Sequence, residues 1–118
     1  MNDYFSLLEE LALASEIVID RPKGSAHPRS PDVIYPLDYG YLAGTQAADG
    51  SGIDVFVGSD SSVGVNGLLL TLDSEKRESE IKVLVNCTDE EVGSAQRFLN
   101  DVLCIGGLLV RRSAESLR

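Results

Sequence analysis

The sequence is poor in the residues on which zinc sites, disulfide frameworks and membrane spans depend. Its 118 residues include two cysteines, one histidine and no tryptophan. Cys87 and Cys104 lack metal-ligand spacing, which disfavours zinc. No apolar run is long enough to cross a bilayer, and the first residues lack the basic region of a secretory signal. We therefore expect a cytoplasmic protein with reduced thiols and no membrane partner.

Positive charge is also scarce, and it is unevenly distributed. The chain has 19 acidic and 10 basic residues, a formal net charge of −9. Between Arg29 and Lys76 there is no lysine or arginine, while the same stretch contains seven acidic side chains. Such a chain repels a phosphate backbone, so we do not expect a nucleic-acid partner. The acidic stretch is open to two interpretations, a solvated surface or a set of ligands for a hard cation.

Hydrophobic periodicity predicts two helices and six strands in one domain that spans residues 1–118. The helices are expected at 3–14 and 88–103, and Thr88 and Glu91 form a capping box for the second. The strands are expected at 16–20, 39–44, 53–58, 67–73, 80–87 and 105–112. All four prolines lie between the first two strands, so the loop there is expected to be rigid and extended rather than regular.

Many short strands and two helices in a small chain indicate an α+β fold. The simplest architecture is a small closed or nearly closed barrel with the 88–103 helix packed on it. Side chains alternate along a strand, which places Asp54 on one face of its strand and Glu80 with Lys82 on one face of theirs. If these faces converge, the three side chains meet, either as an ion pair of little energetic value or as a site for a metal and an anion.

Three segments stand out together: IVIDRPKGS at 17–25, IYPLDYGYLAGT at 34–45 and ADGSGIDVFV at 48–57. In their order and spacing they resemble family I soluble inorganic pyrophosphatases, and the resemblance continues to Lys82. It implies a five-stranded, OB-like barrel with flanking helices, assembled as a homo-oligomer. It also implies hydrolysis of inorganic pyrophosphate, or a related small phosphoanhydride, with Mg²⁺ as cofactor and Mn²⁺ as the alternative. Taken alone, the third segment is more simply a glycine-rich turn that enters a strand.

The resemblance also assigns roles to individual residues. The metal ligands it implies are Asp20, Asp49, Asp54, Glu75 and Glu80. The substrate-binding residues are Tyr35, Tyr39 and Lys82, with Lys23 and Arg29 as the local candidates from the proline-rich loop. The residues expected to take part in catalysis are Asp54, Lys82 and Tyr39. The tyrosines also have a simpler interpretation, as packing residues of a sheet.

The residue types suit the chemistry. Hydrolysis of pyrophosphate needs a hydroxide delivered beside a compact polyanion, and metal ions supply it by acidifying a bound water. Carboxylate oxygens are the ligands that Mg²⁺ prefers, while lysine and arginine position phosphate oxygens. Phosphoryl transfer otherwise asks the protein mainly for positioning and for neutralisation of charge.

Two departures from the family pattern leave the activity open. Ser51 stands where the family has the middle aspartate of its metal motif, and serine cannot act as a carboxylate base. No tyrosine follows Tyr41 and no lysine follows Lys82, so the late tyrosine-lysine clamp of the family is absent unless Arg111 and Arg112 replace it. The chain is therefore either a weak or divergent hydrolase, or a metal-dependent module that binds phosphate or nucleotide without hydrolysis. A purely structural subunit is a third alternative.

Overall fold

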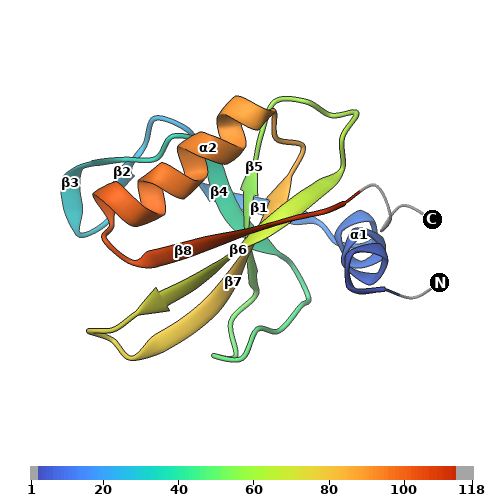
Figure 1. The fold of residues 1–118 in the computed structure, drawn as a ribbon, viewed down its shortest axis with the longest axis horizontal. Helices are drawn as coiled ribbons and strands as arrows, with labels where there is room; N and C mark the ends of the chain where they lie inside the picture. The colour runs from blue at the N-terminus through green and yellow to red at the C-terminus, as the bar shows by residue number, and fades with distance from the viewer. Residues whose placement is uncertain (1–2, 114–118) are drawn as a thin grey trace.

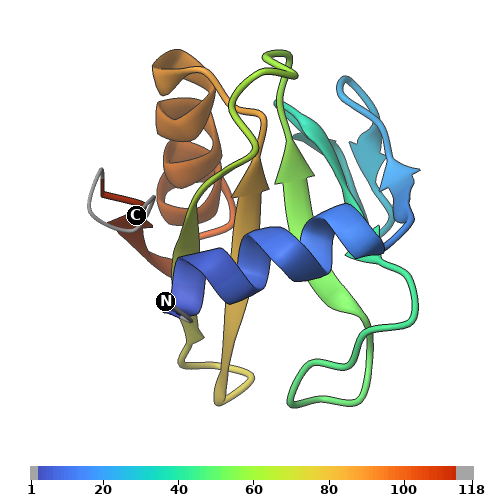
Figure 2. The same ribbon diagram turned by 90° about the vertical axis from the view of Figure 1, so that its right-hand side faces the viewer.

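A computed structural model describes residues 3–113 as a six-stranded mixed sheet with a helix against each face (Figures 1 and 2). In chain order the elements are α1 (Tyr4–Ala14), β1 (Ile17–Arg21), β2 (Ala26–His27), β3 (Ser30–Ile34), β4 (Asp38–Leu42), β5 (Ile53–Val57), β6 (Val65–Asp73), β7 (Glu78–Val85), α2 (Asp89–Arg97), a π-helical turn η1 (Phe98–Val102) and β8 (Gly106–Arg111). The strand order of the sheet is β1-β4-β5-β7-β6-β8, and β2 pairs only with β3 in a separate hairpin. No helix within residues 3–113 is long and apolar enough to cross a membrane.

The locally encoded elements follow the sequence closely. Both helices and all six predicted strands are present, with ends shifted by a few residues. The capping box at the start of α2 is confirmed, because the Glu91 amide donates to Thr88 Oγ1 at 3.2 Å and the Thr88 amide donates to Glu91 Oε1 at 2.9 Å. The proline-rich loop is more regular than predicted, since it contains the β2–β3 hairpin.

The predicted five-stranded, closed or nearly closed OB-like barrel is wrong, although the α+β class is right. β1 and β8 lie at opposite ends of the sheet, and no pairing joins them within the described part of the chain. The physical reason is that the sheet buries both of its faces. One apolar cluster lies under α2 and includes Phe56, Leu84 and Phe98, and a second lies under α1 and includes Leu8 and Val55. A barrel would have gathered these side chains into one interior.

At the free edge of β8, a side chain satisfies backbone groups that would otherwise be free to pair with another strand. The Asn100 amide group donates to the Gly107 carbonyl oxygen at 3.1 Å, and its Oδ1 accepts from the Gly107 amide at 3.1 Å. Both outward-facing backbone groups of Gly107 are thereby satisfied without another strand.

Strand register brings the polar side chains onto the face that α2 partly covers. Asp54 of β5 pairs with Lys82 of β7 in a parallel ladder, and Tyr39 of β4 pairs with Phe56 of β5. Cross-strand partners share a face of the sheet, so Tyr39, Asp54 and Lys82 all face α2. The polar faces defined by strand alternation therefore do converge, on an open sheet instead of inside a barrel.

A β-bulge in β1 determines which of its side chains reaches this face. The register shifts between Ile19 and Arg21, so Arg21 rather than Asp20 pairs with Tyr39. The neighbouring position on β4 must be glycine, because a Cβ atom on Gly40 would lie 1.8 Å from the Val18 carbonyl oxygen.

Candidate functional site

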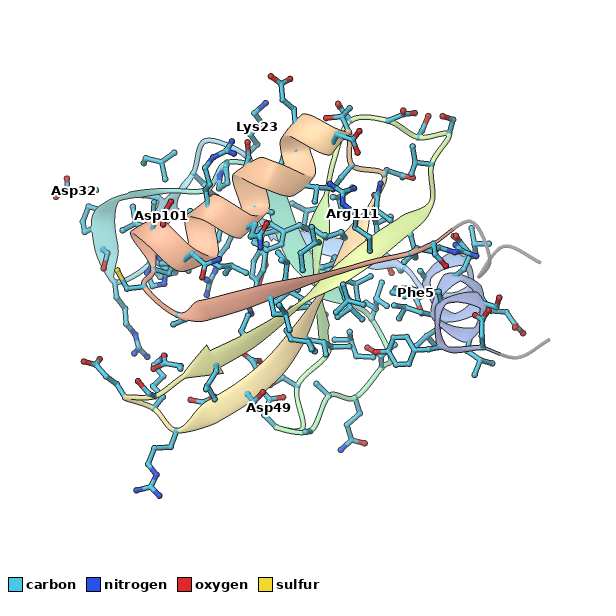
Figure 3. All side chains as sticks on the ribbon, in the orientation of Figure 1. Phe5, Lys23, Asp32, Asp49, Asp101 and Arg111 are labelled. Carbon is cyan, nitrogen blue, oxygen red and sulfur yellow. The ribbon has the colours of Figure 1, made fainter. Side chains whose placement is uncertain are left out.

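A cleft of about 410 Å³ opens over the polar side chains on this face of the sheet. Its floor is formed by β4, β5 and β7, and its rim by the β2–β3 hairpin and the turn between β6 and β7. The volume falls within the range of roughly 300–1,000 Å³ that is typical of small-molecule pockets. In Figure 3, Asp49 is seen in the loop between β4 and β5 that borders the cleft near β7.

Lys82 lies at the floor of the cleft with its ammonium group fully engaged. Its Nζ donates to Tyr39 Oη at 2.8 Å, to Asp54 Oδ2 at 3.1 Å and to Glu80 Oε1 at 3.5 Å. The residue is only 6% exposed, whereas the two carboxylate side chains are 26% and 29% exposed. An ammonium has three donors, so these partners use its whole capacity and fix its position.

The environment of Lys82 keeps it charged and keeps Tyr39 protonated. Burial opposes the charged ammonium, but Tyr39 and the carboxylates of Asp54 and Glu80 more than offset it, so the pKa of Lys82 is raised above its usual value. Burial is also the main cause that raises the pKa of Tyr39, to about 12, although Lys82 acts in the opposite direction. Because the Tyr39 oxygen accepts from Lys82, its own proton is available to a ligand in the cleft.

Arg21 forms part of the cleft wall and was not among the residues predicted for the site. Its Nη1 donates a hydrogen bond to Tyr35 Oη, and its guanidinium carbon lies 5.4 Å from the Tyr35 ring centroid and 5.7 Å from that of Tyr39. Burial is the largest single influence and lowers the pKa of Arg21, but the hydrogen bond to Tyr35 and the electrostatic effects of Tyr35, Tyr39 and Asp20 together outweigh it, so the pKa is raised. Sequence alternation could not reveal the bulge in β1, which places Arg21 opposite Tyr39 where regular alternation would have placed Asp20, although Asp20 also lines the cleft.

The rim of the cleft adds further nitrogen donors. His27 stacks on Tyr35 with ring centroids 6.2 Å apart and an interplanar angle of 6°, and its Nδ1 accepts from the Arg29 amide at 3.1 Å. The pKa of His27 is lowered by burial and then by the positive charges of Arg21, Arg29 and Lys76. In its neutral form the ring must therefore carry its proton on Nε2.

Six carboxylates also belong to the polar lining. The acidic residues that line the cleft are Asp20, Asp49, Asp54, Asp73, Glu78 and Glu80. Within residues 3–113 no three or more of the His, Cys, Asp and Glu side chains are already grouped as metal ligands. Asp54 and Glu80 contact Lys82, and Asp49 Oδ1 accepts from the Ser51 amide at 3.0 Å.

The structure brings most of the predicted site residues together. Eight line this one cleft: Asp20, Arg29, Tyr35, Tyr39, Asp49, Asp54, Glu80 and Lys82. Lys23 and Glu75 do not line it. The exposed Lys23 donates its amide to Asp38 Oδ1 at 2.8 Å, and Glu75 lies in the exposed turn after β6, where its amide donates to Asp73 Oδ1 at 3.1 Å.

Three other residues named in the sequence analysis do not line the cleft. Arg111 forms an exposed ion pair with Asp89 at 3.3 Å, and Arg112 pairs with Glu9 of α1 at 2.5 Å, so neither contributes to the cleft. Cys87 is buried, and burial raises the pKa of its thiol to about 12, which leaves it without nucleophilic character at neutral pH.

Comparisons of the chain with models of known protein families, with curated protein sequences and with solved structures find no match. The resemblance to family I pyrophosphatases therefore stays a prediction from the three sequence segments.

Proposed function

We propose that the cleft binds inorganic pyrophosphate, or a related small phosphoanhydride, and hydrolyses its P–O–P bond with Mg²⁺ or Mn²⁺ as cofactor. The observation that carries this proposal is the buried Lys82 ammonium, which two carboxylates and the Tyr39 hydroxyl hold at the floor of the cleft. A fixed cation beside anionic oxygens suits a site that binds phosphate and metal at neighbouring positions.

The cationic side of the cleft supports binding of a phosphate group. Lys82 and Arg21 lie on the sheet, while Arg29 and Lys76 approach from the rim. Among the described residues, only Tyr35 accepts a hydrogen bond from the Arg21 guanidinium, so its other N–H groups are available to phosphate oxygens. A planar guanidinium held by two aromatic rings is well suited to bidentate contact with phosphate.

The acidic side of the cleft supports a magnesium ion. Mg²⁺ keeps several waters and is commonly bound by one or two carboxylates together with substrate phosphates, so a preformed protein cage is not required. Asp49 and Asp54 are the carboxylates of this side that match aspartates of the pyrophosphatase metal motif, and Asp20 and Glu80 line the same cleft. When bound, the ion supplies an acidified water and neutralises charge on the phosphates.

Ser51 favours a second candidate function, which is binding without hydrolysis. It lines the cleft at the position where the family pattern has a carboxylate. A hydroxyl group donates and accepts hydrogen bonds but does not take a proton from water at neutral pH. On this alternative, the cleft holds metal and phosphate but releases no product.

Phosphate release from pyrophosphate tests the proposal. We expect release that requires Mg²⁺ or Mn²⁺ and that falls at least about a hundredfold in Asp54→Asn, the size of effect expected for a group that acts directly on the reaction. The matched control is Asp89→Asn, which removes an exposed carboxylate outside the cleft and should leave the rate unchanged. Background rates in every protein and with every metal would reject hydrolysis, and calorimetric binding of Mg²⁺-pyrophosphate would then support the second candidate.

A cytoplasmic location and a homo-oligomeric assembly belong to the same proposal. Both come from the sequence, and sedimentation of the purified protein would test the assembly.

A further inference from the structure

We propose that the substrate is an organic diphosphate. Its diphosphate group occupies the cleft, and its aliphatic group occupies a neighbouring apolar hollow. This inference rests on the proposed function and adds the class of substrate. The apolar hollow has a volume of about 480 Å³ and is lined by Ala47, Ala48, Ile53, Leu70 and Ile81, together with the adjoining polar residues of the same loop and of β7.

The cleft and the apolar hollow meet at one end of the sheet. Asp49, Glu78 and Glu80 line both of them. The cleft lies on the face that α2 covers, whereas Ile53 and Ile81 pack toward the apolar cluster under α1, so the two hollows lie on opposite faces.

The register of β5 and β7 explains how a ligand can reach both faces. Their pairing begins at Asp54 and Lys82, although β7 already begins at Glu78. The first residues of β7 therefore have no paired strand on their β5 side, and the loop of residues 46–49 lines the apolar hollow together with them. Because Asp49, Glu78 and Glu80 border both hollows beyond the end of this pairing, a ligand that lies across them would reach both faces.

The lining of the apolar hollow indicates what kind of group occupies it. Leu70 is 38% exposed, although its neighbours Leu68 and Leu69 are buried, and Ile53 and Ile81 are only partly covered. These side chains are aliphatic, and covering them removes apolar surface from water. Inorganic pyrophosphate is compact and has no part that could cover them, whereas an aliphatic ester of diphosphate does.

The reaction on such a substrate is a simple hydrolysis. The oxygen of a water molecule bonds to the terminal phosphorus, and the bond from that phosphorus to the bridging oxygen breaks. The bridging oxygen leaves with the organic monophosphate. One proton of the water stays on the released phosphate and the other passes to solvent.

A pair of diphosphate esters that differ only in the organic group tests this inference. Methyl diphosphate has the same anhydride as isopentenyl diphosphate but cannot fill the apolar hollow. We expect kcat/KM for isopentenyl diphosphate to exceed that for methyl diphosphate by about tenfold, the discrimination that a small apolar pocket supplies. Binding to the protein with Mg²⁺, measured by calorimetry, should show the same preference.

Two variants test whether the preference for the isopentenyl ester arises in the apolar hollow. Leu70→Ser should abolish it while leaving turnover of inorganic pyrophosphate unchanged, and Ala48→Trp should abolish it by filling the apolar hollow from the exposed loop. Leu108→Ser is the matched control, since Leu108 is the cross-strand partner of Leu70, is 64% exposed and does not line the hollow.

The outcomes separate this inference from the proposed function. Equal kcat/KM for both esters, or a preference that survives Leu70→Ser and Ala48→Trp, would overturn the inference while hydrolysis of pyrophosphate stands. If no diphosphate is hydrolysed, the proposed function fails, and calorimetry still decides the inference. Tighter binding of the isopentenyl ester then supports it, and equal or absent binding overturns it.

Discussion

The Tyr39 hydroxyl oxygen accepts a hydrogen bond of 2.8 Å from Lys82 Nζ, although their strands are not neighbours in the sheet. The two side chains meet above β5, which lies between β4 and β7 and contributes Asp54 to the same contact. This arrangement fixes a cation, a carboxylate and a phenolic proton in one place.

Removal of the Lys82 ammonium should affect both activity and stability. We expect Lys82→Met to lower phosphate release at least about a hundredfold, because the variant lacks the fixed cation at the cleft floor. It should also lower the free energy of unfolding by about 1–3 kcal/mol, since Asp54 and Glu80 lose their charged partner. Assays and urea unfolding would measure the two effects. Lys23→Met removes an exposed lysine outside the cleft and should change neither.

Arg21 should act mainly in substrate binding. Arg21→Lys keeps the positive charge but loses the planar fork and its contact with two tyrosine rings. We expect KM for pyrophosphate to rise by about tenfold in Arg21→Lys, and further in Arg21→Ala, with a smaller change in kcat. Arg97→Lys, on the exposed surface of α2, is the control. An unchanged KM in Arg21→Ala would exclude this residue from the phosphate site.

A carboxylate at position 51 should increase hydrolysis. Ser51 lines the cleft beside Asp49, and Ser51→Asp would provide a general base where the sequence has a hydroxyl. We expect the rate of phosphate release to rise by about tenfold or more. A lower rate, with unchanged binding of pyrophosphate, would show that the base of this reaction lies elsewhere.

The Tyr39–Lys82 contact should make stability depend on alkaline pH. The pKa of Tyr39 is raised to about 12 in the folded protein, mainly by burial, and that of Lys82 is raised as well. Between pH 10 and 12 the unfolded chain therefore binds fewer protons than the folded protein, and stability falls as pH rises. For Tyr39 alone this loss amounts to about 2–3 kcal/mol across the interval.

Urea midpoints of the native protein and of Tyr39→Phe, measured at pH 8, 10 and 11, would check this expectation. The midpoint should fall more steeply with pH in the native protein than in the variant. Parallel decreases in the two proteins would show that Tyr39 titrates at its ordinary pKa.

The parts of the fold that the sequence predicts are those set by neighbouring residues. The capping box at Thr88 and Glu91 requires contacts only three residues apart, and the alternation along β5 and β7 already places Asp54 and Lys82 on faces that can converge. The order of strands depends on contacts between distant segments, and the apolar runs do not reveal that each face of the sheet has its own helix and its own cluster. A barrel was therefore predicted where an open sheet exists.

In the candidate site too, the sequence predicts the residues placed by local alternation and misses those placed by irregular structure. Residues on regular strands, such as Tyr39 and Lys82, lie in the cleft as their alternation allows. Arg21 was missed because a single bulged residue reverses the alternation of β1. The β2–β3 hairpin was missed because its prolines disfavour regular pairing, and it places His27 and Arg29 on the rim.

Phosphorus NMR of pyrophosphate incubated with the protein tests the central claim most directly, because one spectrum reports both binding and hydrolysis. With Mg²⁺ present, the pyrophosphate signal should shift on addition of protein and then convert to the phosphate signal, and Asp54→Asn should slow the conversion at least about a hundredfold. A pyrophosphate signal that neither shifts nor converts with Mg²⁺ or Mn²⁺ would contradict the account.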